Sequence, residues 1–554
     1  MKLRLLAIAL AGALGLPAAW AADNSDAQAA RKAHRAEGLV LTNARIYTMD
    51  GESRVVDEVL VKNGRFVEVG KKVDRSDQVP VIDAGGRTVI PGIIDAHNHI
   101  VLVGNRPGWH TGMEHAFTIP DALAEYRARA AALDAAGVPT DQFVTTIGPI
   151  SAIQFAENRL PTIQELDTVS LTRPVYVQAA QGGSRANSAA AAWFAANNPA
   201  VTVNPATGAV SGPALQTLRQ RFLTPETRKR TAHDALQYFT TLGITTHRDS
   251  GAFHSELPSN GIASENTYTM HFPFLALDRE KRMPARLRID FLHQDASTDA
   301  ALTTLAPRLR HSFPFFGNDW LRTGGIGEFT GGGLNGLLAI GRAGWRGEDH
   351  SLSLNNFISL VNLRQQAHDQ LVTEGFTDGI SKLRWVISHV PGTTEASVNQ
   401  FKALGGGLLV GWGPTRSGTN IGPAYRTLFD NGIPLGWHSD GGDITVISPW
   451  LNLYATISGK NLRGMHDPNA PLVNAGQTLT RYEAIWLATA ANKWFIWEED
   501  VGSIEIGNHA DFVVLDRDFF TIPEADIPRV RSALTVIGGK IMHDAGVVSV
   551  RRHD

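Results

Sequence analysis

Two histidines separated by one residue, His97 and His99, end the apolar segment at 89–94. Side chains alternate along a β-strand, so Asp95 shares their face. Imidazole nitrogens beside a carboxylate can hold a cation such as zinc. The alternative is an exposed strand on which this pair has no function. The apolar start and polar end of the segment favour metal binding, because barrel enzymes place their chemistry at the C-terminal ends of strands.

Two later segments end in the same way. His389 follows the apolar segment 385–388, where an ordinary half-buried histidine is the alternative. In the segment 433–443, alternation places Gly436, His438 and Asp440 on one face. A buried carboxylate needs a partner, and a metal with its water is one candidate. A helix N-cap is the other role open to an acid at this place.

The two ends of the chain are rich in strand patterns. Strands are expected near 39–48, 58–69 and 79–83, and again at 502–507, 510–515 and 533–542. The first set makes an incomplete sheet. We therefore expect residues 38–90 and 499–554 to form one β-sandwich around an inserted catalytic domain.

Residues 91–498 alternate helical patterns with short apolar strands, for example at 162–177, 227–246, 286–291 and 383–389. This order is typical of βαβ units and a parallel sheet. We predict an α/β fold, a single (β/α)8 TIM-like barrel with insertions. The alternative is a doubly wound sheet, but no Gly-x-Gly-x-x-Gly follows the first strand.

The first 21 residues have the pattern of a secretory signal peptide, with Lys2 and Arg4 before an apolar stretch and Ala19-Trp20-Ala21 at the cleavage site. A membrane anchor is the alternative, although Pro17 interrupts the short apolar stretch. We predict that residues 1–21 are removed and that 22–37 form a flexible spacer. The mature protein is then exported, to the periplasm or the medium, and is not a membrane protein.

Composition limits the partners and the chemistry. The 554 residues are 43% hydrophobic and 19% charged, with a net charge of −3. This near balance argues against nucleic acid or an anionic membrane as the main partner. The absence of cysteine excludes disulfides and thiolate chemistry, so any metal depends on histidines and carboxylates. Homo-oligomer formation stays open.

Taken together, these segments resemble the YtcJ-like branch of the metal-dependent amidohydrolase superfamily. The matching parts are the segment 91–99, the strand-end His389, the Ser439-Asp440 pair followed by Ser448-Pro449-Trp450, the segment 479–484 and the closing segment 502–516. The resemblance implies the barrel and the sandwich described above. It also implies that His97, His99, His389 and Asp440 bind a divalent metal, with Asp440 as the catalytic proton shuttle. Zinc is the expected ion.

The chain departs from this family at two places. At the end of the fifth barrel strand, where relatives carry a histidine, the best match here is Asn355, a weak zinc ligand. Where many relatives carry a carboxylated lysine on the fourth strand, this chain has Arg322, which cannot be carboxylated, and Glu328, which either binds metal or faces the pocket. His350 is another candidate ligand, but strand alternation puts it off the polar face. One ion is expected, and a second is in doubt.

Two functions follow from the sequence. The first is hydrolysis of a carbon–nitrogen bond in a small amide, formamide or cyclic amide by metal-activated water. In that case His438 could orient a ligand or the substrate. The second is a degenerate barrel that binds a small molecule without efficient turnover. An isomerase or lyase that uses the same metal is a weaker third hypothesis.

Overall fold

The computed structural model describes residues 38–75, 79–179, 183–252, 268–293, 301–328, 333–411, 414–415, 422–442 and 445–551. The predicted signal peptide (1–21) and spacer (22–37) lie outside these ranges. Among the described helices, none has both the length and the apolar character needed to cross a bilayer.

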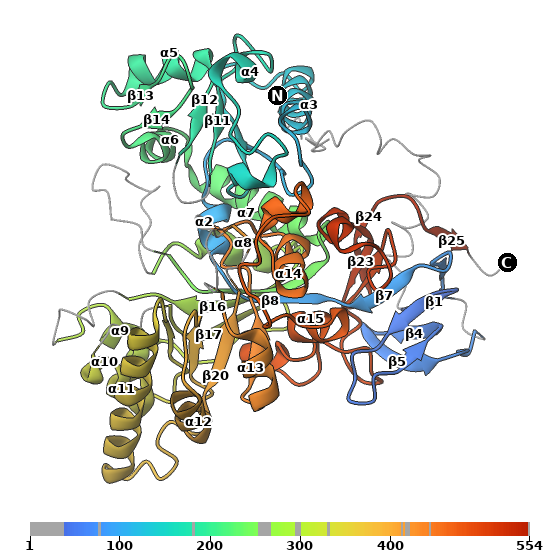
Figure 1. Ribbon diagram of the computed structural model, residues 1–554, viewed down its shortest axis with the longest axis vertical. Coiled ribbons are helices and arrows are strands. Elements are labelled where there is room, and N and C mark those ends of the chain that lie inside the picture. The colour runs from blue at the N-terminus through green and yellow to red at the C-terminus, as the bar shows by residue number, and fades with distance from the viewer. Residues whose placement is uncertain are drawn as a thin grey trace, which may run out of the picture.

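Both ends of the chain contribute to the same two sheets, at the right of Figure 1. The five-stranded sheet has the order β25 (Ser549–Arg551), β6 (Val81–Asp83), β1 (Gly38–Thr42), β4 (Glu58–Lys62), β5 (Arg65–Gly70). The six-stranded sheet has the order β24 (Lys540–Asp544), β23 (Ser532–Ile537), β22 (Phe512–Leu515), β7 (Thr88–Pro91), β2 (Arg45–Tyr47), β3 (Val55–Val56). The expectation that strands from the two ends share sheets is therefore confirmed.

The two sheets bury one set of apolar side chains. Leu41, Val59 and Phe66 of the first sheet lie in the same buried cluster as Val89 and Phe512 of the second. Burial of each such side chain contributes roughly 1.5–3 kcal/mol. The strand expected at 502–507 is absent, because Gly502 and Gly507 both have positive φ, which interrupts an extended chain.

The middle of the chain contains two four-stranded parallel sheets. The first has the order β17 (Leu321–Ile326), β16 (Arg286–Phe291), β15 (Ile244–Asp249), β8 (Ile93–Asn98). The second has the order β18 (Glu348–His350), β19 (Val386–Ser388), β20 (Gly407–Val410), β21 (Leu435–Trp437). The fold is therefore mixed α/β, with helices following the parallel strands.

The two parallel sheets meet at both of their edges. A parallel bridge joins Ile326, at the end of β17, to Gly347, just before β18. At the other edge, the Asp440 N–H donates to the His97 carbonyl at 3.0 Å, and the His99 N–H donates to the Gly441 carbonyl at 2.7 Å. The segment after β21 thus runs beside the end of β8, and the C-terminal ends of distant strands come together.

Helices pack outside the parallel strands (Figure 1). In α11, Phe357, Val361, Ala367 and Leu371 are buried at intervals of four, six and four residues, which gives the helix one apolar face. The Ser353 side chain caps this helix by accepting from the Asn356 N–H at 3.2 Å. The helices are α2 (Ile100–Gly104), α7 (Pro225–Thr240), α8 (Phe272–Arg279), α9 (Leu305–His311), α10 (Leu334–Arg342), α11 (Leu354–Thr373), α12 (Glu395–Ala403), α13 (Tyr425–Asn431), α14 (Pro449–Ser458), α15 (Arg481–Ala488) and α16 (Lys493–Ile496).

Between β8 and β15 the chain forms a separate layer, at the top of Figure 1. Its sheet has the order β12 (Arg185–Ala186), β11 (Val175–Val177), β10 (Val144–Thr146), β9 (Trp109–Thr111). It also contains α3 (Ile119–Ala135), α4 (Ile163–Asp167), α5 (Ser188–Asn197), α6 (Ala214–Phe222) and the hairpin β13 (Thr202–Val203) and β14 (Val210–Ser211). The strand expected near 174–177 exists, but it belongs to this inserted sheet and pairs with β10 and β12, not with the parallel strands that carry His97.

Candidate metal centre

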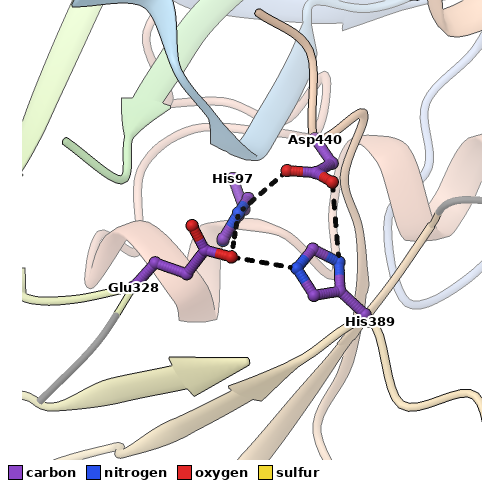
Figure 2. Close-up of side chains that lie close together, drawn as sticks. All are labelled: His97, Glu328, His389 and Asp440. Atoms are coloured by element: carbon purple, nitrogen blue, oxygen red, sulfur yellow. Dashed lines mark hydrogen bonds and ion pairs between the residues drawn. The ribbon is translucent and has the colours of Figure 1, made fainter. Parts of the chain in front are cut away.

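Four buried side chains face one another at the ends of the parallel strands (Figure 2). One ligand atom from each of His97, Glu328, His389 and Asp440 lies within 4.8 Å of the other three. His97 Nε2 is 3.4 Å from Asp440 Oδ1, and His389 Nε2 is 3.2 Å from Glu328 Oε1. Two imidazoles and two carboxylates at these distances are a donor set that suits a divalent cation.

The position of each side chain follows from its strand. His97 lies on β8, and Glu328, His389 and Asp440 lie just after β17, β19 and β21. His389 and Asp440 have φ angles of 68° and 54°, in the left-handed region that non-glycine residues rarely adopt. Such a conformation costs on the order of 1–3 kcal/mol and persists where the surroundings enforce it, often at functional sites. Both residues turn the chain sharply while their side chains point into the centre.

His99 lies next to this group. Its Nδ1 is 2.7 Å from the Gly251 carbonyl, so Nδ1–H is the donor and Nε2 is directed at the carboxylates. Nε2 is 3.2 Å from Glu328 Oε2 and 3.3 Å from Asp440 Oδ1. His99, which follows the end of β8, therefore reaches two of the four residues of the centre.

The carboxylates control the protonation of the histidines. Burial alone would lower the pKa of His97, but Glu348 and Asp440 outweigh it and raise this pKa to about 10. The pKa of His99 is also raised, because Asp440 and Glu328 overcome the effect of burial. Burial would raise the pKa of Asp440, yet His389 and His97 lower it. Without a cation, protons on the histidines balance the acids.

Two buried atoms of the centre lack hydrogen bonds, and this indicates whether a cation fits there. His97 Nε2 and Asp440 Oδ1 are both buried, and neither makes a hydrogen bond within the described part of the chain. Buried polar atoms are normally satisfied, because leaving one unpaired costs about 1–3 kcal/mol. A divalent ion would coordinate both atoms at once, so the residues present fit a metal.

Behind His97 lies a buried set of charges that our sequence interpretation did not identify. His97 Nδ1 is 2.5 Å from Glu348 Oε1, on β18. Arg248, on β15, forms ion pairs with both Glu348 and Asp290. All of these side chains are fully buried. Glu348 therefore fixes the ring of His97, with Nε2 turned toward the centre.

A sequence signal for this set was present. His247, Arg248 and Asp249 stand in succession at the end of a predicted strand, and polar residues at a buried strand end indicate a site. Their pairing with Glu348 could not be read from spacing, since Arg248 and Glu348 are far apart in the chain.

His438 faces the centre from the residue after β21. Its ring centroid is 4.9 Å from that of His97 and 5.0 Å from that of His389. Neither of its ring nitrogens has a hydrogen-bond partner among the described residues. Burial and the charges of His97 and His389 lower its pKa, so the ring is neutral at neutral pH. The expectation that His438 shares a face with Asp440 agrees with this position.

Our register for the fifth parallel strand was wrong. Asn355 does not end a strand: it is exposed in the first turn of α11. Strand β18 ends instead at His350, whose Nδ1 is 3.0 Å from Glu328 Oε1. The side chain of His350 thus contacts Glu328, although strand alternation had placed it off the polar face. That alternation does not extend to residue 355, because the chain enters α11 at its N-cap, Ser353, instead of continuing as a strand.

Arg322 also lies outside the four-residue centre. It is at the start of β17, whereas Glu328 follows the end of that strand. Its Nη1 is 3.3 Å from Glu498 Oε1, and its Nη2 is 3.8 Å from Asp319 Oδ1. Arg322 therefore takes part in ion pairs at the opposite end of the strand. Glu328, by contrast, is a member of the centre.

Comparisons with known proteins show what the chain is similar to. Residues 80–351 and 363–543 match the family model described as "Amidohydrolase family". The chain is 32% identical over 157 residues to an N-substituted formamide deformylase of Arthrobacter pascens, covering 27% of this chain and 28% of that protein. It is 34% identical over 122 residues to the putative amidohydrolase YtcJ of Bacillus subtilis strain 168, covering 22% of each. These alignments span less than a third of either relative.

Solved structures share the fold. An uncharacterized metal-dependent hydrolase from Pyrococcus horikoshii OT3 superposes with a TM-score of 0.54 at 17% identity. The superposition covers 88% of this chain and 99% of that one. At this identity the likeness concerns the architecture alone.

Proposed function

The chain belongs to the amidohydrolase family, and from this premise we propose that it is a metal-dependent hydrolase of carbon–nitrogen bonds. The proposed substrates are small amides, formamides or cyclic amides. The formamide deformylase among its relatives supports this class, although the shared segment is short.

One observation carries the proposal. The ends of β8, β17, β19 and β21, far apart in sequence, bring two imidazoles and two carboxylates within 4.8 Å of one another in a buried centre. Packing alone does not favour such a set, because buried ionisable groups are expensive to desolvate. A bound cation would offset this cost and explains why these side chains converge.

We infer that the eight parallel strands β8 and β15 to β21 form one closed (β/α)8 barrel. The bridge between Ile326 and Gly347 and the hydrogen bonds from Asp440 and His99 at the other edge support closure. We likewise infer that the two sheets built from the chain ends form a β-sandwich around a shared core. The corresponding domains are 38–90 and 499–554 for the sandwich and 91–498 for the barrel.

We propose one zinc ion held by His97, His99, His389 and Asp440, with Glu328 as a further ligand. Nitrogen and carboxylate donors without thiolate suit zinc at a catalytic site. Glu328 also contacts His350, so these two residues with His389 are the set that would hold a second ion. The metal-to-protein ratio distinguishes one ion from two.

When bound, a divalent ion activates water and polarises a carbonyl group. The residues of the chain have separate tasks. Asp440 is ionised at neutral pH, so its carboxylate can accept a proton from the attacking water and pass it to the leaving nitrogen. Glu348 holds His97 through Nδ1, which leaves Nε2 for the cation. The neutral ring of His438 offers a donor and an acceptor to orient the substrate.

The signal-peptide pattern of residues 1–21 indicates the compartment in which the protein would act. We propose that the protein acts in the periplasm or outside the cell, after cleavage before Ala22. The intact mass of the exported protein tests this, and a mass that includes residues 1–21 would contradict it.

A substrate screen tests the proposed function. Zinc-loaded protein is incubated with N-formyl amines, simple amides and cyclic amides, and release of amine is measured. Asp440→Asn retains the side-chain shape and an oxygen donor but not the proton carrier, so we expect turnover to fall by about 100-fold or more while most of the metal stays bound. Metal-loaded protein that hydrolyses no compound in the screen would favour the binding-protein alternative.

A further inference from the structure

Asp95 is a buried carboxylate that the proposed mechanism does not use. It lies on β8 two residues before His97, and its side chain is fully buried. It is not one of the four residues that converge at the candidate metal centre. Instead, its Oδ1 accepts from the Ser439 N–H at 3.0 Å, and its Oδ2 accepts from the Ser439 hydroxyl at 2.5 Å. Both oxygens are thus engaged with the residue that precedes Asp440.

The Ser439 hydroxyl makes two hydrogen bonds with opposite roles. It donates its proton to Asp95, so the lone pairs of its oxygen are left to accept. The oxygen accepts from the Gly441 N–H at 2.9 Å. This second bond joins a serine to the residue two positions later, and it closes a turn around Asp440. By taking the hydroxyl proton, the Asp95 carboxylate therefore determines how the turn is closed.

Asp440 needs this support because its backbone conformation is unfavourable. Its φ of 54° lies in the left-handed region, which is costly for a residue other than glycine. The residue before it is fixed further by Thr445, whose Oγ1–H donates to the Ser439 carbonyl at 2.5 Å. The residue after it is tightly packed, since a Cβ added at Gly441 would lie 2.2 Å from Cγ1 of Ile447. The turn is thus held on both sides.

The turn decides where the Asp440 carboxylate points. Figure 2 shows the carboxylate directed at His97 and His389. Its Oδ1 is 3.4 Å from His97 Nε2 and 3.3 Å from His99 Nε2. A catalytic group that is misplaced by about 1 Å can lose much of its effect. A looser turn would therefore disturb metal binding and proton transfer together.

The alternative is that Asp95 only ties β8 to the segment after β21. Asn492 forms such a tie elsewhere between the same two strands. Its Nδ2 donates to the carbonyls of Ile94 and Trp437 at 2.6 and 2.7 Å, and its Oδ1 accepts from the Trp437 N–H at 3.0 Å. Asn492 is also fully buried, but none of these bonds reaches the turn at Asp440. It is therefore a matched control for a purely structural tie.

We propose that Asp95 is a positioning residue for Asp440, which it holds in place through Ser439. This inference rests on the proposed function, because it takes Asp440 as a metal ligand and proton carrier. It makes one demand that a structural tie does not make, which is that the effect of Asp95 passes through Asp440. A substitution at Asp95 should then matter only while the Asp440 carboxylate is present.

A double-mutant cycle of Asp95→Asn and Asp440→Asn tests this demand, with kcat and KM measured on the zinc-loaded protein. The amide introduced by Asp95→Asn can accept from the Ser439 N–H, but it presents its own N–H to the hydroxyl, whose proton then loses its acceptor. We expect Asp95→Asn to lower kcat by about 10- to 100-fold and to change KM by no more than about twofold. In the Asp440→Asn background, the same substitution should change kcat by no more than about twofold.

The second measurement is independent of turnover. Cobalt(II) replaces zinc as the probe, because its visible absorption bands report the geometry of its ligands. Asp95→Asn should change these bands in the wild-type background and leave them unchanged in the Asp440→Asn background. If no substrate is found, the proposed function fails, whereas the cobalt spectra still decide whether Asp95 positions Asp440.

Asn492→Ala is the control, and it should lower the midpoint of thermal unfolding while it leaves the cobalt bands and kcat per bound metal unchanged. If Asp95→Asn does not fold, Ser439→Ala takes its place in the cycle, with an expected loss in kcat of roughly threefold to tenfold. The proposal fails if the effects at positions 95 and 440 are additive, or if Asn492→Ala changes the bands and kcat equally. It also fails if Asp95→Asn lowers stability alone, or if the wild type binds no cobalt.

Discussion

Glu348→Gln tests the role of the buried carboxylate behind His97. Glu348 Oε1 is 2.5 Å from His97 Nδ1, and its other oxygen pairs with Arg248. The amide retains the shape and an acceptor for His97 but removes the negative charge. Loss of such a partner of a metal ligand typically weakens metal affinity by 10- to 100-fold, which is about 1.4–2.7 kcal/mol.

The substitution also affects folding, because Arg248 then has Asp290 as its remaining ion-pair partner. Removing one member of a buried ion pair costs about 3–5 kcal/mol. The free energy of unfolding is therefore measured by denaturant titration alongside metal affinity. Glu374→Gln is the control, since Glu374 is exposed and pairs with Arg342 at the surface, so the substitution should change stability little and metal affinity not at all.

Metal affinity is measured by competition with a chromophoric chelator at fixed pH. Glu348→Gln that folds and binds zinc as tightly as the wild type would refute the argument that Glu348 positions His97. A loss of affinity in the Glu374 control of the same size would refute it too.

Three other predictions follow. Zinc affinity should rise with pH between 6 and 8. Because the pKa of His97 is near 10, zinc must displace a proton from this ring in order to bind. Competition with a chelator across this pH range measures the affinity. The free energy of unfolding of the metal-free protein should fall as pH rises from about 6.5 toward 10. A histidine whose pKa is raised in the folded state stabilises the fold only while its ring is protonated. Denaturant titrations at several pH values measure this loss. Asp511→Asn should lower the free energy of unfolding by about 3–5 kcal/mol. Asp511, just before β22, pairs with the buried Arg286 on β16 at 2.7 and 3.0 Å, and the substitution removes its charge. Denaturant titration of the variant checks this value.

The sequence predicted the local features well. Apolar runs that end in polar residues gave the strands that carry His97 and His389, and turn residues separated the N-terminal strands close to their observed bounds. These signals are local, because alternation and turn chemistry act over a few residues. The sharing of sheets by both chain ends was predicted because the N-terminal strands alone left open edges.

Other features depend on contacts distant in the chain. The inserted sheet was assigned to the barrel, since a short apolar strand such as β11 has the same pattern in either sheet. Asn355 was misplaced because the strand before it is only three residues long and cannot fix a register. Glu348 was not identified because its partners, His97 and Arg248, lie on other strands.

The central claim is that His97 and its neighbours hold a catalytic metal ion. Metal content by mass spectrometry, together with hydrolysis of the best substrate, tests it in the wild type, in chelated and reloaded wild type, and in His97→Ala. We predict about one zinc per wild-type chain, loss of activity on chelation with recovery on reloading, and neither metal nor activity in His97→Ala. Activity that survives thorough chelation and is equal in His97→Ala would contradict the account.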